Sequence, residues 1–247
     1  MLLLGGCRSK EAEERKRAPA KIRELPANAP RLAIIIDDMG YDHAAAENLF
    51  TLQYPLTCSV LPHLPASGQV AEEAHRRGYQ VMLHLPMEAE GGEAKQEAIF
   101  LHAGLSVRQT DQTLSDMLAT VPYVVGVNNH QGSRATADAA LMSELMPLLH
   151  RRKLFFIDSR TTVSSRAYTA AREAGVPTAY RRVFLDDVPT REAVLRQLDL
   201  AAEDAQRNGW SIAIGHPHPV TIEALRYFLP QAHLRGIRLV FVSELVR

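Results

Sequence analysis

The sequence predicts an α/β fold in which mostly parallel strands form a distorted barrel. From Leu32 to the C-terminus, eight apolar runs alternate with amphipathic segments of helical length, as in folds built from repeated strand–helix units. Seven or eight such units within about 215 residues favour closure into a (β/α) barrel, and a doubly wound open sheet is the alternative. A length of 247 residues, of which 46% are hydrophobic, is sufficient for one large domain.

The apolar runs give the expected strands. The first of them, Leu32–Ile36, is apolar throughout, which indicates burial on both faces of the sheet. In chain order, the strands are expected at Leu32–Ile36, Thr57–Leu61, Val81–Leu85, Val124–Val127, Leu154–Ile157, Ala179–Leu185, Ser211–Ile214 and Arg238–Val242.

Capping residues mark the expected helix ends between these strands. Ser106 and Gln109 form a capping box at the start of one helix. Three further helices are expected to begin at threonine N-caps, namely Thr136, Thr190 and Thr221. Four glycines follow helical segments and precede strands, where a left-handed conformation ends a helix: Gly78, Gly175, Gly209 and Gly236.

Residues 1–31 are expected to form a signal remnant and a disordered tether, which leaves residues 32–247 as the folded domain. Leu4-Gly5-Gly6-Cys7 has the residue order found at the end of a bacterial lipoprotein signal, although no basic region precedes it. The interpretation is that the true start lies upstream of Met1 and that a lipid on Cys7 tethers a periplasmic or otherwise exported cell-envelope protein. An accidental cysteine in a frayed terminus is the alternative.

Charge is distributed unevenly along a chain whose formal net charge is zero. Residues 1–31 hold eight of the 28 basic residues but only four of the 28 acidic residues, so the expected domain is mildly acidic. This distribution gives no reason to expect a nucleic-acid partner. Cys58 lies in an apolar strand and is expected to be an inert core residue.

Two adjacent carboxylates, Asp37 and Asp38, follow the first strand. Neighbouring carboxylates repel each other unless a cation or a shared proton relieves them, so the pair suits a metal site or divided acid and base roles. The alternative is an exposed turn that caps the helix beginning near His43.

Polar residues also end nearly every other expected strand: His63, His84, His130, Asp158, Asp186, Asp187, His216 and His218. Because parallel strands of a barrel end at one rim, this clustering predicts a shared site, and Asp with His suits zinc or a similar divalent ion.

Five motifs, in order along the chain, resemble the divergent polysaccharide deacetylase family, a remote branch of the NodB-type deacetylases. They are Ile34-Ile35-Ile36-Asp37-Asp38-Met39-Gly40, His84-Leu85-Pro86-Met87-Glu88, Gly126-Val127-Asn128-Asn129-His130-Gln131-Gly132-Ser133, Phe156-Ile157-Asp158-Ser159-Arg160-Thr161-Thr162 and Ile214-Gly215-His216-Pro217. The resemblance implies a distorted NodB-like barrel, in agreement with the barrel expected from periodicity.

The resemblance also implies a metal site. The first motif implies that Asp37 is the general base and that Asp38 is a metal ligand, and His84 corresponds to the first histidine of the deacetylases' metal motif. Ordinary deacetylases have another histidine four residues later, where this chain has Glu88. His130 is therefore the preferred third ligand, and Glu88 is the alternative.

The same resemblance implies further roles around the metal. His216 corresponds to the histidine that protonates the leaving amine, and Asp158 with Arg160 resembles a pair that orients a ligand or the base. The full set of expected supporting or substrate-binding residues is Glu88, Asn129, Ser133, Asp158, Arg160 and His218.

These roles would support metal-dependent hydrolysis that removes acetyl groups from an envelope or extracellular glycan. The expected cofactor is a divalent metal, with zinc preferred, and the expected partner is the glycan. The altered second and third motifs leave an alternative, a catalytically inactive, metal-containing module that binds glycans or a protein partner. Phosphoryl transfer fits poorly, because enzymes with an aspartyl nucleophile usually place one residue between their two aspartates, whereas Asp37 and Asp38 are adjacent.

Overall fold

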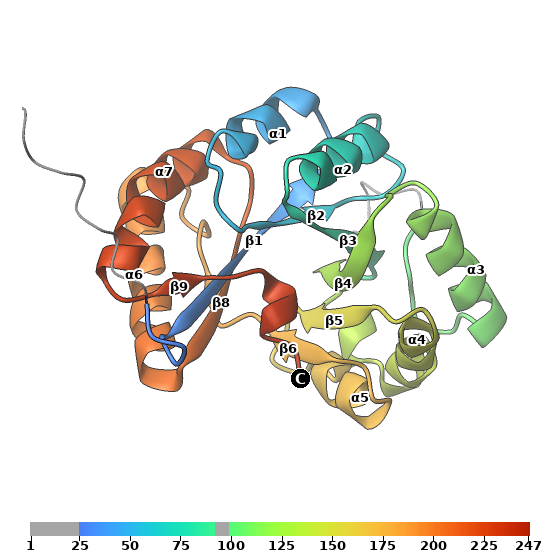
Figure 1. Ribbon diagram of the computed structural model, residues 1–247. Helices are drawn as coiled ribbons and strands as arrows, with labels where there is room; N and C mark the ends of the chain where they lie inside the picture. Colours follow the sequence, from blue (N-terminus) through green and yellow to red (C-terminus); the bar gives the residue numbers. More distant parts are fainter. Residues whose placement is uncertain (1–24, 92–98) are drawn as a thin grey trace, which may run out of the picture.

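The computed structural model describes residues 25–91 and 99–247 (Figure 1). Cys7 and residues 8–24, which carry the expected lipid anchor and most of the expected tether, lie outside the described residues. Within the described ranges, no helix has the length and apolar character that a membrane span requires.

The folded domain extends further toward the N-terminus than the expected boundary at Leu32. Arg238 Nη2 donates a hydrogen bond to the carbonyl oxygen of Pro26 (2.8 Å), and Ala29 is buried. The first strand begins at Arg31. Residues 25–31, which the composition assigned to the tether, therefore contact the barrel.

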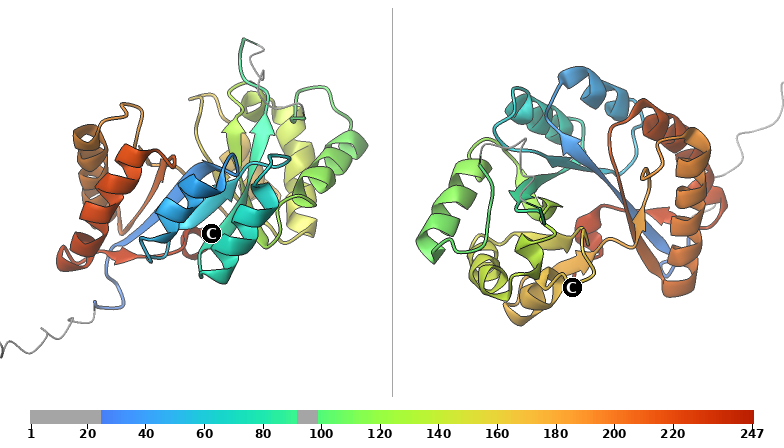
Figure 2. Two further views of the ribbon diagram at one scale, coloured as in Figure 1. Left: turned by 90° about the horizontal axis from the view of Figure 1, so that it is seen from above. Right: turned by 180° about the vertical axis from the view of Figure 1, so that it is seen from behind.

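The strands form a single sheet in which every pairing among the described residues is parallel. The spatial order is β6-β5-β4-β3-β2-β1-β8-β7, and β9 pairs with the start of β1. The strands are β1 (Arg31–Met39), β2 (Thr57–Val60), β3 (Gln80–Met87), β4 (Val124–Gln131), β5 (Phe155–Asp158), β6 (Thr178–Tyr180), β7 (Val183–Phe184), β8 (Trp210–Gly215) and β9 (Arg238–Leu239). The sheet curls into a distorted barrel, as expected, and its strand arrowheads point to one side of the molecule (Figure 2, left). The carboxyl ends of the strands therefore share one rim.

Helices cover the outside of this sheet (Figures 1 and 2). They are α1 (His43–Phe50), α2 (Ser67–Arg76), α3 (Val107–Leu118), α4 (Ala139–Arg151), α5 (Ala167–Glu173), α6 (Arg191–Asn208) and α7 (Pro219–Leu234), with short 3-10 helices at Ala135–Ala137 and Val242–Glu244. The capping box of Ser106 and the N-cap Thr190 are confirmed. The four glycines expected at helix ends all have positive φ angles.

Two of the expected N-caps are wrong. Thr136 lies within a 3-10 helix, and Asp138 caps α4 instead by accepting a hydrogen bond from Leu141 N (2.9 Å). Thr221 lies inside α7, and its hydroxyl donates to Asp186 Oδ2 (2.8 Å). This threonine therefore supports the rim of the barrel and does not start a helix.

One expected strand, Ala179–Leu185, is in fact two strands that pair with opposite edges of the sheet. β6 pairs with β5, whereas β7 pairs with β8. The partner changes between two arginines, because Arg181 N donates to Asp158 O (2.9 Å) and Arg182 N donates to Ile212 O (2.9 Å). The chain thus bridges the two edges of the curled sheet, and we call this junction the seam. The last expected strand is also shorter than predicted, since a 3-10 helix at Val242–Glu244 follows β9.

The sheet separates two apolar clusters, and β1 contributes to both. Leu32, Ile34 and Ile36 pack in the cluster between the sheet and the helices. Ala33 and Ile35 pack inside the barrel. The expectation that this strand is buried on both faces is confirmed, and Cys58 is also fully buried.

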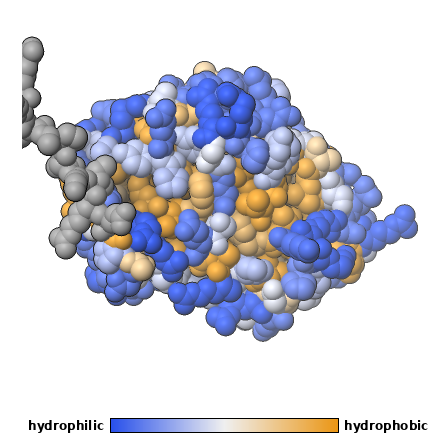
Figure 3. All heavy atoms as spheres, in the orientation of Figure 1, coloured by the Kyte–Doolittle hydropathy of each residue, from blue (hydrophilic) through white to orange (hydrophobic). Residues whose placement is uncertain are grey.

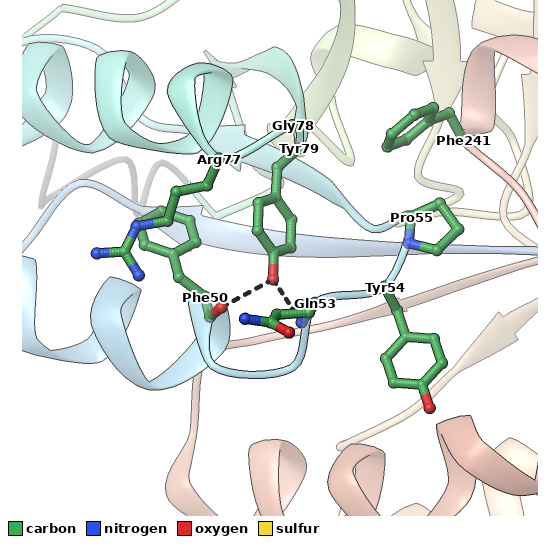
Figure 4. Close-up of a pocket in the computed structure, with 8 residues that line it drawn as sticks. All are labelled: Phe50, Gln53, Tyr54, Pro55, Arg77, Gly78, Tyr79 and Phe241. Carbon is green, nitrogen blue, oxygen red and sulfur yellow. Dashed lines mark hydrogen bonds between the residues drawn. The ribbon is translucent and has the colours of Figure 1, made fainter.

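The face at the amino ends of the strands carries a group of apolar residues surrounded by polar ones (Figure 3). Figure 3 shows apolar residues gathered on the face that carries β9 and the C-terminus. A pocket of about 470 Å³ opens there (Figure 4), and Tyr79 Oη in its wall accepts a hydrogen bond from Gln53 N (3.0 Å) and donates one to Phe50 O (3.2 Å). Its lining contains neither a carboxylate nor a histidine. The titratable residues expected at strand ends lie at the opposite rim.

Candidate active site

An irregularity in β1 brings both aspartates to the same side. In a regular strand, successive side chains point to opposite faces. Between β1 and β2, however, the register shifts, because Ile36 pairs with Cys58 while Met39 pairs with Val60. One extra residue in β1 is therefore accommodated as a bulge, in which Asp38 has a positive φ of 55°. Conformations of this kind cost free energy in non-glycine residues and are found mainly at functional sites.

The bulge places Asp37 and Asp38 beside two histidines of neighbouring strands. Asp38 Oδ1 lies 3.2 Å from His84 Nε2 and 3.0 Å from His130 Nδ1. The two ring nitrogens are 3.2 Å apart, and Asp37 Oδ2 lies 3.6 Å from His84 Nε2. The structure thus brings together the three residues that the sequence suggested as ligands.

Asp38, His84 and His130 form a donor set that suits a divalent cation. One carboxylate oxygen and two imidazole nitrogens lie within 4.8 Å of one another. Asp38 Oδ1 is buried, and no described group gives it a hydrogen bond of good geometry. One carboxylate with two imidazoles, and room for a further ligand, is typical of catalytic zinc and related sites. These three residues therefore fit the metal that the sequence predicts.

Asn128 links His84 to Asp37. Its amide nitrogen donates to Asp37 Oδ1 (2.9 Å), which fixes the orientation of the amide. Its oxygen then accepts hydrogen bonds from His84 Nδ1 (3.0 Å) and from Ser59 Oγ. Nε2 is consequently the ring nitrogen of His84 that faces Asp38 and is free to bind a cation placed between them.

His216 approaches the centre from β8 and is held by Asp186, which follows β7. Asp186 Oδ1 lies 2.9 Å from His216 Nδ1, and Asp186 Oδ2 accepts from His216 N (2.6 Å). His216 Nε2 lies 3.7 Å from Asp38 Oδ2. The absence of a side chain at Gly215 leaves room for this arrangement, because a Cβ there would lie 3.1 Å from Asp186 Oδ2.

The surroundings push the pKa values of the two adjacent aspartates apart. Burial raises the pKa of Asp37, although the charge of His84 and the hydrogen bond from Asn128 oppose the shift. Burial also acts on Asp38, but contacts with His130 and His84 outweigh it and lower the pKa of that carboxyl. Divergent pKa values in neighbouring carboxyls indicate different roles, with Asp37 the better proton acceptor.

Whereas Asp37 is suited to accept a proton, His216 retains its own proton and is suited to donate it. Burial disfavours the charged ring, but the hydrogen bond and charge of Asp186 outweigh burial, with smaller contributions from Asp38 and Asp37. Together they raise the pKa of His216 to about 9. A protonated imidazole beside a proton-accepting carboxylate is the arrangement that general acid and base catalysis requires.

Glu88, the alternative ligand, is engaged elsewhere. Its carboxylate accepts from Ala103 N (3.2 Å) and lies 3.4 Å from Arg134 Nε. These contacts hold the segment after β3 against the loop after β4. Among the described residues, the metal-compatible group at Asp38 is completed by His130 and does not include Glu88.

The other expected supporting residues mostly organise loops at the rim. Asn129 Oδ1 accepts from Ser159 N (2.9 Å), and Ser133 Oγ accepts from Glu90 N (2.8 Å). Asp158 accepts from Arg160 N (2.8 Å) and from Ser165 Oγ (2.8 Å), so its hydrogen bonds go to the following loop and not to the base or a ligand. The Arg160 guanidinium lies over the Tyr180 ring.

Two further rim histidines have different surroundings. His218 lies 5.7 Å from His216, measured between ring centroids, and lines a pocket of about 240 Å³ together with Asp38, Tyr41 and His216. This pocket is the opening beside the candidate site. His63 is exposed, and its backbone N–H donates to Thr120 Oγ1 (3.2 Å).

Three residues at the site had no role assigned from the sequence: Asn128, Asp186 and Arg181. Asn128 precedes His130 by two positions in β4, and this spacing could have placed both on one face. Asp186 ends an apolar run, as His216 does, but only the structure shows that the two residues meet. Arg181 donates from Nε to Ser159 O (2.6 Å) at the seam, which the sequence pattern did not reveal.

Comparisons with known proteins bear on the family and the fold of this chain. The family model of the divergent polysaccharide deacetylases matches residues 34–246. The uncharacterized protein YibQ of Escherichia coli is 37% identical over 224 residues, which cover 90% of this chain and 69% of that protein. The crystal structure of the uncharacterized protein ATU2773 from Agrobacterium tumefaciens has a TM-score of 0.84 at 25% identity and covers 88% of this chain and 89% of that chain.

A solved enzyme shares the fold at lower similarity. The catalytic domain of the peptidoglycan N-acetylglucosamine deacetylase from Eubacterium rectale has a TM-score of 0.54 at 14% identity and covers 88% of this chain and 90% of that chain. This likeness concerns the fold alone. The family model, which spans nearly the whole described domain, and the related sequence together show that this chain belongs to the divergent polysaccharide deacetylase family.

Proposed function

We propose that this protein is a metal-dependent hydrolase that removes acetyl groups from an N-acetylated glycan. The observation that carries the proposal is the convergence of Asp38, His84 and His130, with Asp37 on one side and His216 on the other. Membership of the deacetylase family and the shared fold of the Eubacterium rectale peptidoglycan deacetylase support it.

Asp38, His84 and His130 would hold a divalent ion, with zinc preferred for this donor set. Such an ion, when bound, supplies a Lewis acid for the acetyl carbonyl and lowers the pKa of water in the site. The open pocket beside Asp38 and His216 leaves space for the substrate.

Asp37 and His216 would divide the proton transfers of hydrolysis. Asp37 Oδ1 is occupied by the Asn128 amide, which leaves Oδ2 to accept a proton from the attacking water. The carbon–nitrogen bond of the acetamide then breaks, and His216 donates the proton of Nε2 to the departing nitrogen. Acetate and a free amine are the products. Asp186 holds His216 Nδ1, so the Nε2 proton faces the centre.

We also propose that the protein acts in the cell envelope. The order Leu4-Gly5-Gly6-Cys7 and the nature of an acetylated glycan support this location. Mass spectrometry of the native N-terminus tests it. A lipid on Cys7 would support anchoring, whereas an unmodified cysteine after an intact Met1 would contradict it.

Paired substitutions test the division of roles between the aspartates. Asp37→Asn should keep metal content near that of the wild type and lower the rate of acetate release by roughly 10²–10⁴-fold, the contribution of a general base. Asp38→Asn should lose both metal and activity. Metal analysis and acetate release from N-acetylglucosamine oligomers are the two measurements. Equal behaviour of the variants would contradict the assignment.

A binding module is the second candidate, and the contacts of Glu88 favour considering it. Where ordinary deacetylases have a histidine, this residue holds Arg134 and the Ala103 amide. Stoichiometric metal without acetate release from any N-acetylated or O-acetylated glycan would support the binding module and contradict hydrolysis.

A further inference from the structure

A second polar pocket lies at the seam, near the candidate active site. Its volume is about 460 Å³, and Arg160, Arg181 and Arg182 line it together with Asp158 and several hydroxyl-bearing residues. Arg160 belongs to the loop after β5, whereas Arg181 and Arg182 connect β6 to β7. The pocket thus lies where the two edges of the curled sheet meet.

Hydrogen bonds connect this pocket to the proposed base. Arg181 Nε donates to Ser159 O (2.6 Å), and the Ser159 hydroxyl accepts from Asn128 Nδ2 (3.2 Å). The same amide nitrogen donates to Asp37 Oδ1 (2.9 Å). Ser159 and Asn128 thus connect the pocket to the proposed base through two hydrogen-bonded residues.

Nearby carboxylates neutralise only part of the positive charge. Asp158 also lines the pocket, where its charge acts on Arg181 while its oxygens accept hydrogen bonds within its own loop. Arg182 forms a bidentate ion pair with Asp204, in which Nη2 lies 2.6 Å from Oδ1. Arg160 takes part in no ion pair with a carboxylate of the described chain, and its ordered ring contact is with Tyr180.

Arg160 is also held in an unusual conformation. Its φ is 49°, in the left-handed region that non-glycine residues seldom occupy, and its N–H is fixed by Asp158 Oδ1 (2.8 Å). The guanidinium carbon lies 3.7 Å from the centroid of the Tyr180 ring. Stacking on an aromatic face orders the guanidinium and leaves its N–H edge available for an oxyanion.

We propose that Arg160, supported by Arg181, binds an oxyanion carried by the sugar substrate, so that the protein prefers acidic to neutral N-acetylated glycans. The inference rests on the proposed function, because it names the substrate class of the same site. A carboxylate and a phosphate share the required chemistry, since both accept two parallel hydrogen bonds from a guanidinium.

Equilibrium binding to three saccharides tests the preference. They are a neutral N-acetylglucosamine oligomer, an oligomer that alternates N-acetylglucosamine with glucuronate, and an N-acetylglucosamine oligomer that carries a phosphate ester. The full chain with Asp37→Asn is used so that the saccharides are not consumed. At least one acidic saccharide should bind more tightly than the neutral one, and the tighter of the two identifies the anion.

Arg160→Gln is the decisive variant, because glutamine keeps much of the side-chain length and removes the charge. It should weaken binding of the preferred acidic saccharide by about tenfold, the effect of losing one charge-assisted hydrogen bond, and leave the neutral saccharide unchanged. Arg196→Gln, on the exposed side of α6, is the matched control and should change neither affinity. Equal binding of all three saccharides, or equal losses in both variants, would overturn the proposal.

Acetate release by the wild type separates this inference from the proposed function. An Arg160-dependent preference without acetate release would contradict hydrolysis and support the oxyanion pocket. Acetate release at equal efficiency from neutral and acidic saccharides would support hydrolysis and contradict the pocket.

Discussion

His84 and His216 flank the same carboxylate, Asp38, but their second ring nitrogens have different partners. His84 Nδ1 contacts the neutral amide of Asn128, whereas His216 Nδ1 contacts the carboxylate of Asp186. His84 is almost fully buried, and His216 is partly exposed at the opening of the site.

The difference suits two separate tasks. A neutral hydrogen-bond acceptor fixes the tautomer of His84 and leaves Nε2 able to donate a lone pair to a metal. A charged acceptor stabilises the protonated ring of His216, whose pKa rises to about 9. The amide partner therefore suits His84 to the proposed role of ligand, and the carboxylate partner suits His216 to the proposed role of proton donor.

Removing each histidine should give the largest effects and should distinguish the two tasks. His84→Ala removes a ligand, so both metal content and acetate release should fall to background. His216→Ala should retain the metal and lower the rate by roughly 10²–10⁴-fold through loss of a general acid. Metal analysis and the acetate assay are made on the same preparations.

Glu88→Ala is the control for this comparison and should retain the metal, because Glu88 contacts Ala103 N and Arg134. Loss of metal from His216→Ala would contradict the separation of tasks. Loss from Glu88→Ala with retention in His130→Ala would show that the third ligand is Glu88.

Replacing Asp186 by asparagine should have the next largest effect and should appear in the pH profile. A ring whose pKa is about 9 keeps its proton below that pH, so the wild-type rate should fall only above about pH 9. Without the charge of Asp186, the pKa should approach the ordinary histidine value of about 6.5, and the alkaline fall should begin correspondingly lower. The measurement is kcat/KM against pH.

The acid side of the same profile is an internal control. Burial raises the pKa of Asp37, and this carboxyl must be ionised to accept a proton, so activity should also fall as the pH decreases. Asp186→Asn should leave that acid limb nearly unchanged. A variant whose alkaline limb coincides with that of the wild type would show that Asp186 does not set the protonation of His216.

Asn128→Ala should change the protonation of His216 least among these variants. It should clearly weaken metal binding through His84. It removes hydrogen bonds to His84 and Asp37, which should lower the free energy of unfolding by about 1–3 kcal/mol. Loss of such a supporting contact should weaken metal affinity by roughly 10–100-fold. Denaturant unfolding of the metal-free protein and metal titration measure the two effects.

Asn129→Ala is a matched control for the neighbouring position. Its side chain bonds to Gln131 O and Ser159 N, so its removal should cost stability without a comparable loss of metal affinity. If both variants bind metal as the wild type does, Asn128 does not orient the ligand.

The sequence predicted the barrel and much of its rim because the physical signals there are local. Strand periodicity, polar strand ends and the adjacent aspartates could all be recognised within short segments. The bulge that turns Asp37 and Asp38 to one side could not, since it depends on the pairing of β1 with β2. Periodicity likewise predicted a single strand over Ala179–Leu185, because the apolar pattern of the sequence shows no break where the backbone changes its partner strand.

The partners of the site residues were harder to predict for the same reason. Thr221 was expected to cap a helix from its position in the chain, but its hydroxyl reaches Asp186 across the rim. The contact of Asp186 with His216 joins two segments separated by a whole helix, α6. Such contacts depend on tertiary packing, and sequence spacing contains no direct signal for them.

The position of β1 in the sheet has a consequence for how the protein folds. β1 comes first in the chain but lies between β2 and β8, and Ile34 pairs with Ala213 near the opposite end of the sequence. During synthesis, one edge of this apolar strand therefore has no native partner until β8 emerges, and unpaired edges favour aggregation. Pairings over such sequence distances also form slowly. The contact between Asp38 and His216 depends on this late step, so the candidate active site should be among the last parts of the molecule to assemble.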